Sequence, residues 1–174
     1  GHRMWPGVYG DGSSRKNLLA SCEQSLQRMG LDYVDVFYSH RYDGVTPIEE
    51  TMQALVDIVR AGKALYVGIS KYPPELQAQC YAYLCEQHVP CLVSQYPASM
   101  FRRTSVASVE DSNLSVAAKN GSGFVCFSPL AQGLLTTKYF NGIPANSRAA
   151  KATGFLRTDQ VTPERVEAAR ALHA

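Results

Sequence analysis

Four short apolar segments of the chain each end in a polar side chain that could take part in chemistry. These residues are His40, Ser70, Gln95 and Ser128. If the segments are parallel strands, their carboxyl ends meet at one edge of the sheet, where α/β folds bind ligands. His40 adds an imidazole, which can donate a hydrogen bond to a carbonyl oxygen or transfer a proton near neutral pH. One polar strand end needs no function because it meets solvent, but four together predict a site.

The segment after the fourth apolar run has the composition of an anion-binding loop. Residues 127–139 read FSPLAQGLLTTKY. Proline and glycine shape a loop with free backbone N–H groups, while Lys138 and Arg148 add positive charge. The alternative is an ordinary loop with solvated charges. The absence of acidic residues nearby favours a pyrophosphate or a similar anionic ligand.

Other common kinds of site find no support. No Cys and His residues have zinc-ligand spacing, so no metal is expected. No Gly-x-Ser-x-Gly turn follows a strand, because Gly121-Ser122-Gly123 precedes one. The five cysteines are odd in number, contain no CxxC pair and lie in apolar segments. This predicts buried free thiols in a reducing compartment, and therefore a cytoplasmic protein.

Strand-like and helix-like patterns alternate along the chain, and these elements must position the candidate residues. Continuous apolar runs predict strands near 33–39, 64–69, 91–95 and 124–128. Ser13 and Ser14 offer an N-cap to one helix, and Thr46-Pro47-Ile48-Glu49 reads as the capping box of another. A weaker helix is predicted at about 106–119. The pattern indicates an α/β fold with a parallel sheet built from βα units.

Two arrangements of such units remain open, a doubly wound sheet and a closed barrel. A doubly wound dinucleotide fold carries a GxGxxG turn after a strand, whereas Gly7–Gly12 has the wrong glycine spacing and no strand before it. A barrel needs about 200–250 residues or more. We therefore expect residues 1–174 to be a single partial (β/α)8 TIM barrel domain of about four central βα units, truncated at both ends.

Composition limits the class of partner. The 174 residues carry a net charge of +2, and 45% of them are hydrophobic. This balance argues against a nucleic-acid or acidic-membrane partner. No apolar run approaches the ~20 residues of a membrane helix, so no membrane association is expected.

Two longer motifs resemble those of the aldo-keto reductase family. Residues 31–41, LDYVDVFYSHR, are similar to the family's fourth-strand motif. Residues 127–139, followed by Gly142-Ile143-Pro144 and Ser147-Arg148, are similar to its cofactor loop. Together with residues 46–50 and 63–70, they most resemble the branch that holds bacterial glyceraldehyde-3-phosphate reductases and potassium-channel beta subunits. The similarity covers most of residues 1–150.

This resemblance implies an eight-stranded barrel that binds NADP(H) without a Rossmann fold and reduces a small aldehyde or ketone. In the family a tyrosine donates the proton, helped by a lysine, an aspartate and a histidine. The resemblance assigns the histidine to His40 and places the other three upstream of Gly1. It therefore implies an NADP-dependent oxidoreductase as the parent and an inactive chain when residues 1–174 stand alone.

The resemblance also implies a set of cofactor-binding residues. Ser70 and Gln95 correspond to contacts with the nicotinamide carboxamide, and Phe127 to an aromatic ring stacked on the nicotinamide. Lys71 stands where the family often has Asn, as a basic residue does in the channel-subunit branch. The pyrophosphate loop and its surroundings correspond to Ser128, Leu130, Gly133, Lys138, Ser147 and Arg148.

Two other functions stay open. One is a cofactor-binding regulatory subunit that docks on a channel, although that branch commonly has Asn where this chain has His40. The other is a different barrel that uses His40 in phosphate-sugar chemistry. The parent is also compatible with a homo-oligomer. Half a barrel exposes sheet edges and an apolar interior, so we expect the isolated chain to self-associate or to be poorly soluble.

Overall fold

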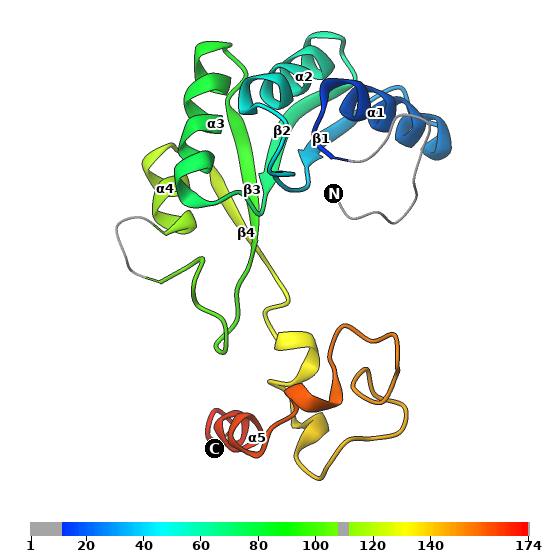
Figure 1. Cartoon of the computed structure of the whole chain (residues 1–174), viewed down its shortest axis with the longest axis vertical. Helices are drawn as coiled ribbons and strands as arrows, with labels where there is room; N and C mark the ends of the chain where they lie inside the picture. The colour runs from blue at the N-terminus through cyan, green and yellow to red at the C-terminus, as the bar shows by residue number, and fades with distance from the viewer. Residues whose placement is uncertain (1–11, 108–111, 174) are drawn as a thin grey trace. The chain divides into compact units, whose positions relative to one another are not determined.

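In the computed structural model, which describes residues 12–107 and 112–173, strands and helices alternate as the sequence predicts (Figure 1). The main elements in chain order are α1 Arg15–Met29, β1 Val34–Ser39, α2 Ile48–Arg60, β2 Ala64–Ser70, α3 Pro74–Glu86, β3 Cys91–Pro97, α4 Asn113–Lys119, β4 Gly123–Phe127 and α5 Pro163–Ala171. Three short 3-10 helices precede α5: η1 Ala131–Gly133, η2 Thr137–Tyr139 and η3 Thr158–Gln160. All four strands lie within two residues of their predicted bounds.

The described residues form two compact units. The first, here called the sheet unit, comprises the residues up to Tyr96 and Ser105–Val125. The second, the loop unit, comprises Pro97–Thr104 and the residues from Cys126 onward. Each unit is described by itself below.

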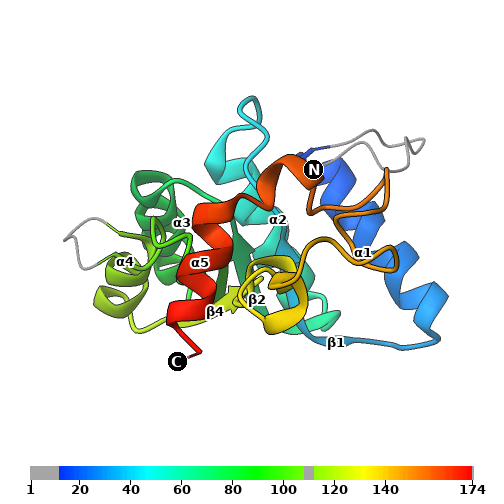
Figure 2. The same ribbon diagram turned by 90° about the horizontal axis from the view of Figure 1, so that it is seen from below.

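The strands of the sheet lie in their chain order, β1-β2-β3-β4. β1 pairs with β2 in parallel and β2 pairs with β3 in parallel. Helices α1 to α4 also contact one another in chain order, so they form one layer beside the sheet (Figure 2). A doubly wound sheet would reverse its strand order and carry helices on both faces. The sequential order and single helical layer are those of four βα units of a TIM barrel, which confirms the predicted fold class.

The core of the sheet unit lies between the sheet and its helices. Met52, Leu55, Val67, Ile69 and Leu84 are completely or almost completely buried there and belong to one apolar cluster. The other face of the sheet is open, because Tyr66 and Val125 are 49% and 42% exposed. Tyr66 and Val125 therefore lie on the face that would line the interior of a barrel.

Close contact between β1 and β2 depends on Gly68. Gly68 lies opposite Tyr38 in the parallel register. A Cβ at position 68 would lie 2.5 Å from Cε1 of the Tyr38 ring, a separation that packed atoms do not tolerate. The missing side chain therefore allows the tyrosine ring to lie across the neighbouring strand.

The helix ends confirm one predicted cap and correct another. Ser14 caps α1, since its Oγ accepts from the Asn17 N–H at 3.3 Å. The capping box predicted from Thr46 is wrong, because α2 starts after Pro47 without a side-chain cap. The Thr46 hydroxyl instead donates to the Asp43 carboxylate at 2.7 Å. A nearby charged acceptor has therefore taken the hydroxyl from the helix end.

Two further expectations are corrected by local structure. The weak helix predicted at 106–119 starts only at Asn113, where Ser112 Oγ accepts from the Ser115 N–H at 3.2 Å; residues 108–111 lie outside the described ones. The cysteines are free, but Cys85 and Cys126 are exposed rather than buried. Their places on the solvent side of α3 and on β4 explain the difference.

The loop unit is ordered around a small apolar cluster. Leu134, Tyr139, Ala149 and Leu156 are buried together. Helix α5 contacts η2, and the Arg170 guanidinium lies over the Phe140 ring, 4.7 Å from its centroid. The segment between β4 and α5 is thus a loop held by its own core, with short 3-10 turns in place of longer helices.

Candidate functional site

The strand tips of the sheet unit bring three predicted residues to one edge. His40 directly follows β1 and is exposed. Ser70 ends β2 and is 2% exposed, and its hydroxyl donates to the Gln95 backbone carbonyl at 2.6 Å. This hydrogen bond ties the tips of β2 and β3 together. The Ser70 hydroxyl therefore has a structural partner as well as its predicted role at the cofactor.

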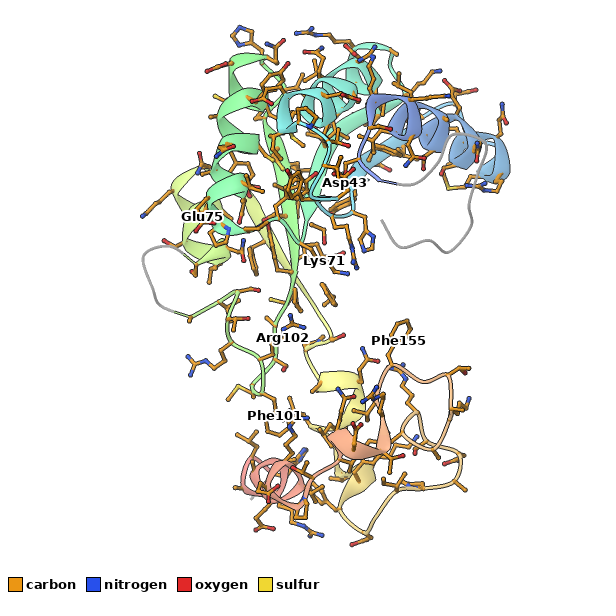
Figure 3. The ribbon with its side chains drawn as sticks, in the orientation of Figure 1. Asp43, Lys71, Glu75, Phe101, Arg102 and Phe155 are labelled. Atoms are coloured by element: carbon orange, nitrogen blue, oxygen red, sulfur yellow. The ribbon has the colours of Figure 1, made fainter. Side chains whose placement is uncertain are left out.

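Lys71 and His40 are in direct contact. The Lys71 Nζ lies 3.2 Å from the His40 Nε2. Lys71 adopts a left-handed backbone conformation with φ of 59°, which is uncommon for a residue with a side chain. It lies at the end of β2, on the same side of the sheet unit as the loop that carries Asp43 (Figure 3). The structure thus joins the predicted catalytic histidine to a predicted cofactor residue.

The segment around His40 is fixed on both sides. Before it, the Ser39 hydroxyl is 2.7 Å from the Tyr72 hydroxyl, and burial raises the pKa of Tyr72, which keeps that group protonated. After it, the Arg41 carbonyl accepts from the Ser13 hydroxyl at 2.8 Å. Although exposed, His40 therefore projects from a constrained backbone, as a group that must meet a substrate requires.

Asp43 organises the loop that follows His40. Its carboxylate accepts from the backbone N–H groups of Ser13, Val45 and Thr46 at 2.8, 3.0 and 2.8 Å, and from the Thr46 hydroxyl. Partial burial acts to raise the pKa of the Asp43 carboxyl, but these hydrogen bonds outweigh it and hold the pKa well below its usual range. The loop therefore depends on an ionised Asp43.

The loop unit contains a cavity of about 500 Å³ around the predicted pyrophosphate loop. Five predicted cofactor residues line it: Ser128, Leu130, Gly133, Lys138 and Arg148. The remaining lining residues are Pro129, Gln132, Thr136 and Tyr139. The cavity therefore has two cationic side chains and no acidic one.

A chain of hydrogen bonds runs along the wall of this cavity. Arg148 Nη1 donates to Gln132 Oε1 at 2.7 Å, and Gln132 Nε2 donates to Ser128 Oγ at 2.8 Å. Ser128, Ala131 and Gln132 all have positive φ, between 49° and 62°. Such backbone is costly for residues with a side chain, and it commonly marks ligand sites. The strained turn allows the glutamine to connect a guanidinium to the strand tip.

The backbone of the loop differs from the expectation in one respect. The N–H groups of Ala131, Gly133, Leu134 and Leu135 donate to carbonyls of the loop itself. They are therefore not free donors for an anion, because the tight turns consume them. The remaining donors for a phosphate in this cavity include the Lys138 ammonium and the other N–H groups of the Arg148 guanidinium.

Two predicted residues of the loop unit lie outside this cavity lining. Ser147 is completely buried, and its hydroxyl has no hydrogen-bond partner among the described residues. Phe127 lines a second cavity of about 500 Å³, with Phe101 and Arg102 among its other lining residues (Figure 3). The predicted aromatic stacking position is thus at an open cavity, as a ring contact with a ligand would require.

Gln132 is the main contributor that the sequence did not single out. It stands inside the quoted loop motif, but nothing in its spacing indicates that it would bridge Ser128 and Arg148. Thr136 and Tyr139 were also missed as cavity residues. Among the described residues no group of His, Cys, Asp and Glu has the arrangement of a metal site. In the same described ranges no helix has the length and apolarity to cross a membrane.

Comparison with known proteins agrees with this architecture. L-glyceraldehyde 3-phosphate reductase of Escherichia coli (strain K12) is 54% identical over 149 residues, which cover 85% of this chain and 42% of that protein. A protein of Arabidopsis thaliana named "Probable voltage-gated potassium channel subunit beta" is 38% identical over 147 residues, or 83% of this chain and 44% of that protein. Its namesake in Oryza sativa subsp. japonica is 38% identical over 141 residues, covering 80% and 42%.

The chain thus spans less than half the length of these relatives. The family model described as "Aldo/keto reductase family" matches residues 2–174. The match covers nearly the whole chain and agrees with the sequential strand order of the sheet. This chain belongs to the aldo/keto reductase family.

Proposed function

We propose that the protein containing this chain is an NADPH-dependent reductase of small aldehydes or ketones. The observation that carries the proposal is the cavity of the loop unit, whose lining includes Lys138 and Arg148 and no acidic side chain. A cavity of about 500 Å³ suits part of a dinucleotide, and two cations suit its phosphates. The similarity to a protein named as a glyceraldehyde 3-phosphate reductase supports the same reading.

The residues of this chain fit an NADP(H) molecule in distinct ways. In this proposal Lys138 and Arg148 bind phosphate oxygens, and Gln132 holds the Arg148 guanidinium through its 2.7 Å hydrogen bond. The family resemblance assigns Ser70, Lys71 and Gln95 to the nicotinamide end and, separately, Phe127 to a contact with its ring. When bound, the nicotinamide supplies the hydride. The chain's own contribution is to orient the reactants and to hold His40 beside the carbonyl.

The chemical step also needs a proton donor. The resemblance assigns that role to a tyrosine, with a lysine and an aspartate, none of which corresponds to a residue of this chain. General acid catalysis contributes about 10²–10⁴-fold to rate. We therefore propose that residues 1–174 alone do not turn over a carbonyl substrate, whereas the complete barrel does.

A regulatory subunit is the second candidate function. The 38% identical relatives named as channel beta subunits and the basic residue at Lys71 favour it. His40 favours the reductase, because an imidazole at the strand tip can bind a carbonyl oxygen. Our proposal also places the reductase in the cytoplasm, with free thiols such as the exposed Cys85 and Cys126 kept reduced, and allows a homo-oligomer of the whole protein.

The test is a fluorescence titration of NADPH against the complete barrel that contains this chain and against its variants. We expect saturable binding that Arg148→Met weakens by about tenfold, since a charge-assisted hydrogen bond contributes about 1.5–3 kcal/mol and this one is partly exposed. Arg103→Met, which also removes an exposed arginine of the loop unit but is not part of the cavity lining, should leave the affinity unchanged.

Turnover provides the second part of the test. NADPH oxidation with glyceraldehyde should be measured for the complete barrel and for residues 1–174. Turnover by the complete barrel alone is the expected result. Absence of saturable NADPH binding, or equal losses in Arg148→Met and Arg103→Met, would refute the cofactor assignment.

A further inference from the structure

Gln132 connects two separate parts of the cavity wall in the loop unit. Its Oε1 accepts from Arg148 Nη1 at 2.7 Å, and its Nε2 donates to Ser128 Oγ at 2.8 Å. Ser128 directly follows β4, whereas Arg148 lies 16 residues beyond the glutamine. All three residues line the same cavity, and Gln132 and Ser128 also line the second one. One half-buried side chain therefore links a cation to a hydroxyl where a ligand has room to bind.

The backbone at position 132 does not by itself call for a glutamine. Gln132 has a φ of 62°, in the left-handed region that glycine and asparagine adopt more readily than other residues. Asparagine would offer the same amide group at a lower conformational cost, but its side chain is one methylene shorter. What distinguishes glutamine here is its reach, because both hydrogen bonds are made by the end of the side chain.

The chemistry of the three groups fixes the direction of both hydrogen bonds. A guanidinium has N–H donors and no acceptor, so the oxygen of the Gln132 amide must face Arg148. The amide nitrogen then faces Ser128 and can only donate, which makes Ser128 Oγ the acceptor. The single O–H proton of Ser128 is not used in this bond. It stays available to an acceptor in the cavity, as do the other N–H groups of Arg148.

We infer that Gln132 is a positioning residue that directs the Arg148 guanidinium and the Ser128 hydroxyl toward one anionic group, a diphosphate. The inference rests on the proposed function for the identity of the ligand and deepens it, because it states how the site holds its phosphates. Donors that are already in place lose less freedom when the ligand binds than free side chains do. The amide also transmits polarisation from the cation to the hydroxyl, because hydrogen bonds in a chain strengthen one another.

A double-mutant cycle in the complete barrel tests whether Gln132 acts through Arg148. Gln132→Met keeps a similar length without a β-branch but forms neither hydrogen bond. We expect it to weaken NADPH binding in a fluorescence titration by about three- to tenfold, as the loss of two partly exposed hydrogen bonds would. In the Arg148→Met background the same change should weaken binding by less than about 1.5-fold. Gln24→Met, at an exposed position of α1, is the matched control and should leave the affinity unchanged.

Gln132→Asn separates positioning from folding. The left-handed backbone accepts asparagine well, so urea unfolding of the complete protein should show at least the stability of Gln132→Met. The shorter amide should not span both partners, so the NADPH affinity should still fall by about as much as in Gln132→Met. If the glutamine had only a structural role, the affinity would instead follow the stability of each variant.

Inorganic pyrophosphate, titrated by isothermal calorimetry, is a second probe that separates this inference from the proposed function. Pyrophosphate binding that shows the coupling between Gln132 and Arg148, without any NADPH binding, would reject the proposed function and leave the positioning role standing. If neither probe binds, the cavity does not take a diphosphate and both proposals are wrong.

Two results with a probe that binds would overturn the inference alone. One is a ratio below about twofold between the effects of Gln132→Met in the two backgrounds. The other is wild-type affinity in Gln132→Asn. If Gln132→Met does not fold, Gln132→Asn takes its place in the cycle.

Discussion

Asp43 offers the sharpest test of how the chain holds its candidate site. Its carboxylate receives four hydrogen bonds and links the start of α1 to the loop after β1. Three of these donors, two N–H groups and a hydroxyl, belong to well-buried residues, because Ser13 is 2% and Thr46 9% exposed. Replacing Asp43 by alanine would leave these buried N–H groups without their acceptor.

The expected loss of stability follows from the two buried N–H groups, those of Ser13 and Thr46. A buried donor that loses its partner costs about 1–3 kcal/mol. The Val45 N–H adds little, since Val45 is 86% exposed and its N–H can bond water. We therefore expect Asp43→Ala to lower the free energy of unfolding by roughly 2–4 kcal/mol. Asp43→Asn keeps one acceptor oxygen and the shape, so it should cost roughly 1–2 kcal/mol.

The effect should depend on pH in a defined direction. The pKa of the Asp43 carboxyl is depressed in the folded state, so its stabilisation is complete above the unfolded-state value of about 3.9. It is lost as the pH falls from there toward the folded-state pKa. By pH 3 the wild type should have lost about 1 kcal/mol through this group. Asp43→Asn has no carboxyl proton to bind. The difference in free energy of unfolding between the wild type and Asp43→Asn should therefore be smaller at pH 3 than at pH 7, by about 1 kcal/mol.

Urea unfolding followed by far-UV circular dichroism at pH 7 and pH 3 measures both quantities. Asp32→Ala, at an exposed position in a loop, serves as the matched control and should change the free energy by no more than about 0.5 kcal/mol. A loss below 0.5 kcal/mol for Asp43→Ala would refute the reasoning. The reasoning would also be refuted if the wild type and Asp43→Asn differed in free energy of unfolding by the same amount at both pH values.

Two further substitutions test the packing of the sheet unit. Gly68→Ala would place a Cβ against the Tyr38 ring and should lower the free energy of unfolding by about 1–3 kcal/mol. Gly30→Ala has open space around the new Cβ and should cost only the roughly 1–2 kcal/mol of its left-handed backbone. Urea unfolding measures both losses. Asn113→Ala should cost about 2–4 kcal/mol, because Asn113 Nδ2 donates to the buried Gln77 Oε1 at 2.6 Å and the amide would lose that partner. A Gly68→Ala protein as stable as the wild type, or an Asn113→Ala loss below 1 kcal/mol, would contradict these assignments.

The strands and their order of alternation with helices were predictable because they depend on local composition. Buried parallel strands need continuous apolar runs, and the run at residues 64–69 appears as β2 Ala64–Ser70. The glycine spacing of residues 7–12 argued against a Rossmann turn, although residues 1–11 lie outside the described ones. The fold class therefore followed from patterns of a few residues at a time.

The helix ends and the loop chemistry were less predictable, because competing partners decide them. Thr46 has the sequence position of a cap, but the nearby Asp43 carboxylate takes its hydroxyl. The loop after β4 has the composition of an anion site, but its turns use several of its backbone N–H groups internally. Local sequence gives the available donors and acceptors, and it does not say which of them meet.

Chain order fixes which side chains stand at the strand ends, because the residue after an apolar run can be read directly from it. The contacts of Lys71 with His40, and of Gln132 with Arg148 and Ser128, arise only when the chain is folded. Those contacts depend on left-handed backbone at Lys71, Ser128 and Gln132, which turns each side chain in a direction that no helical or strand periodicity encodes. Strand pairing then brings together tips that lie tens of residues apart.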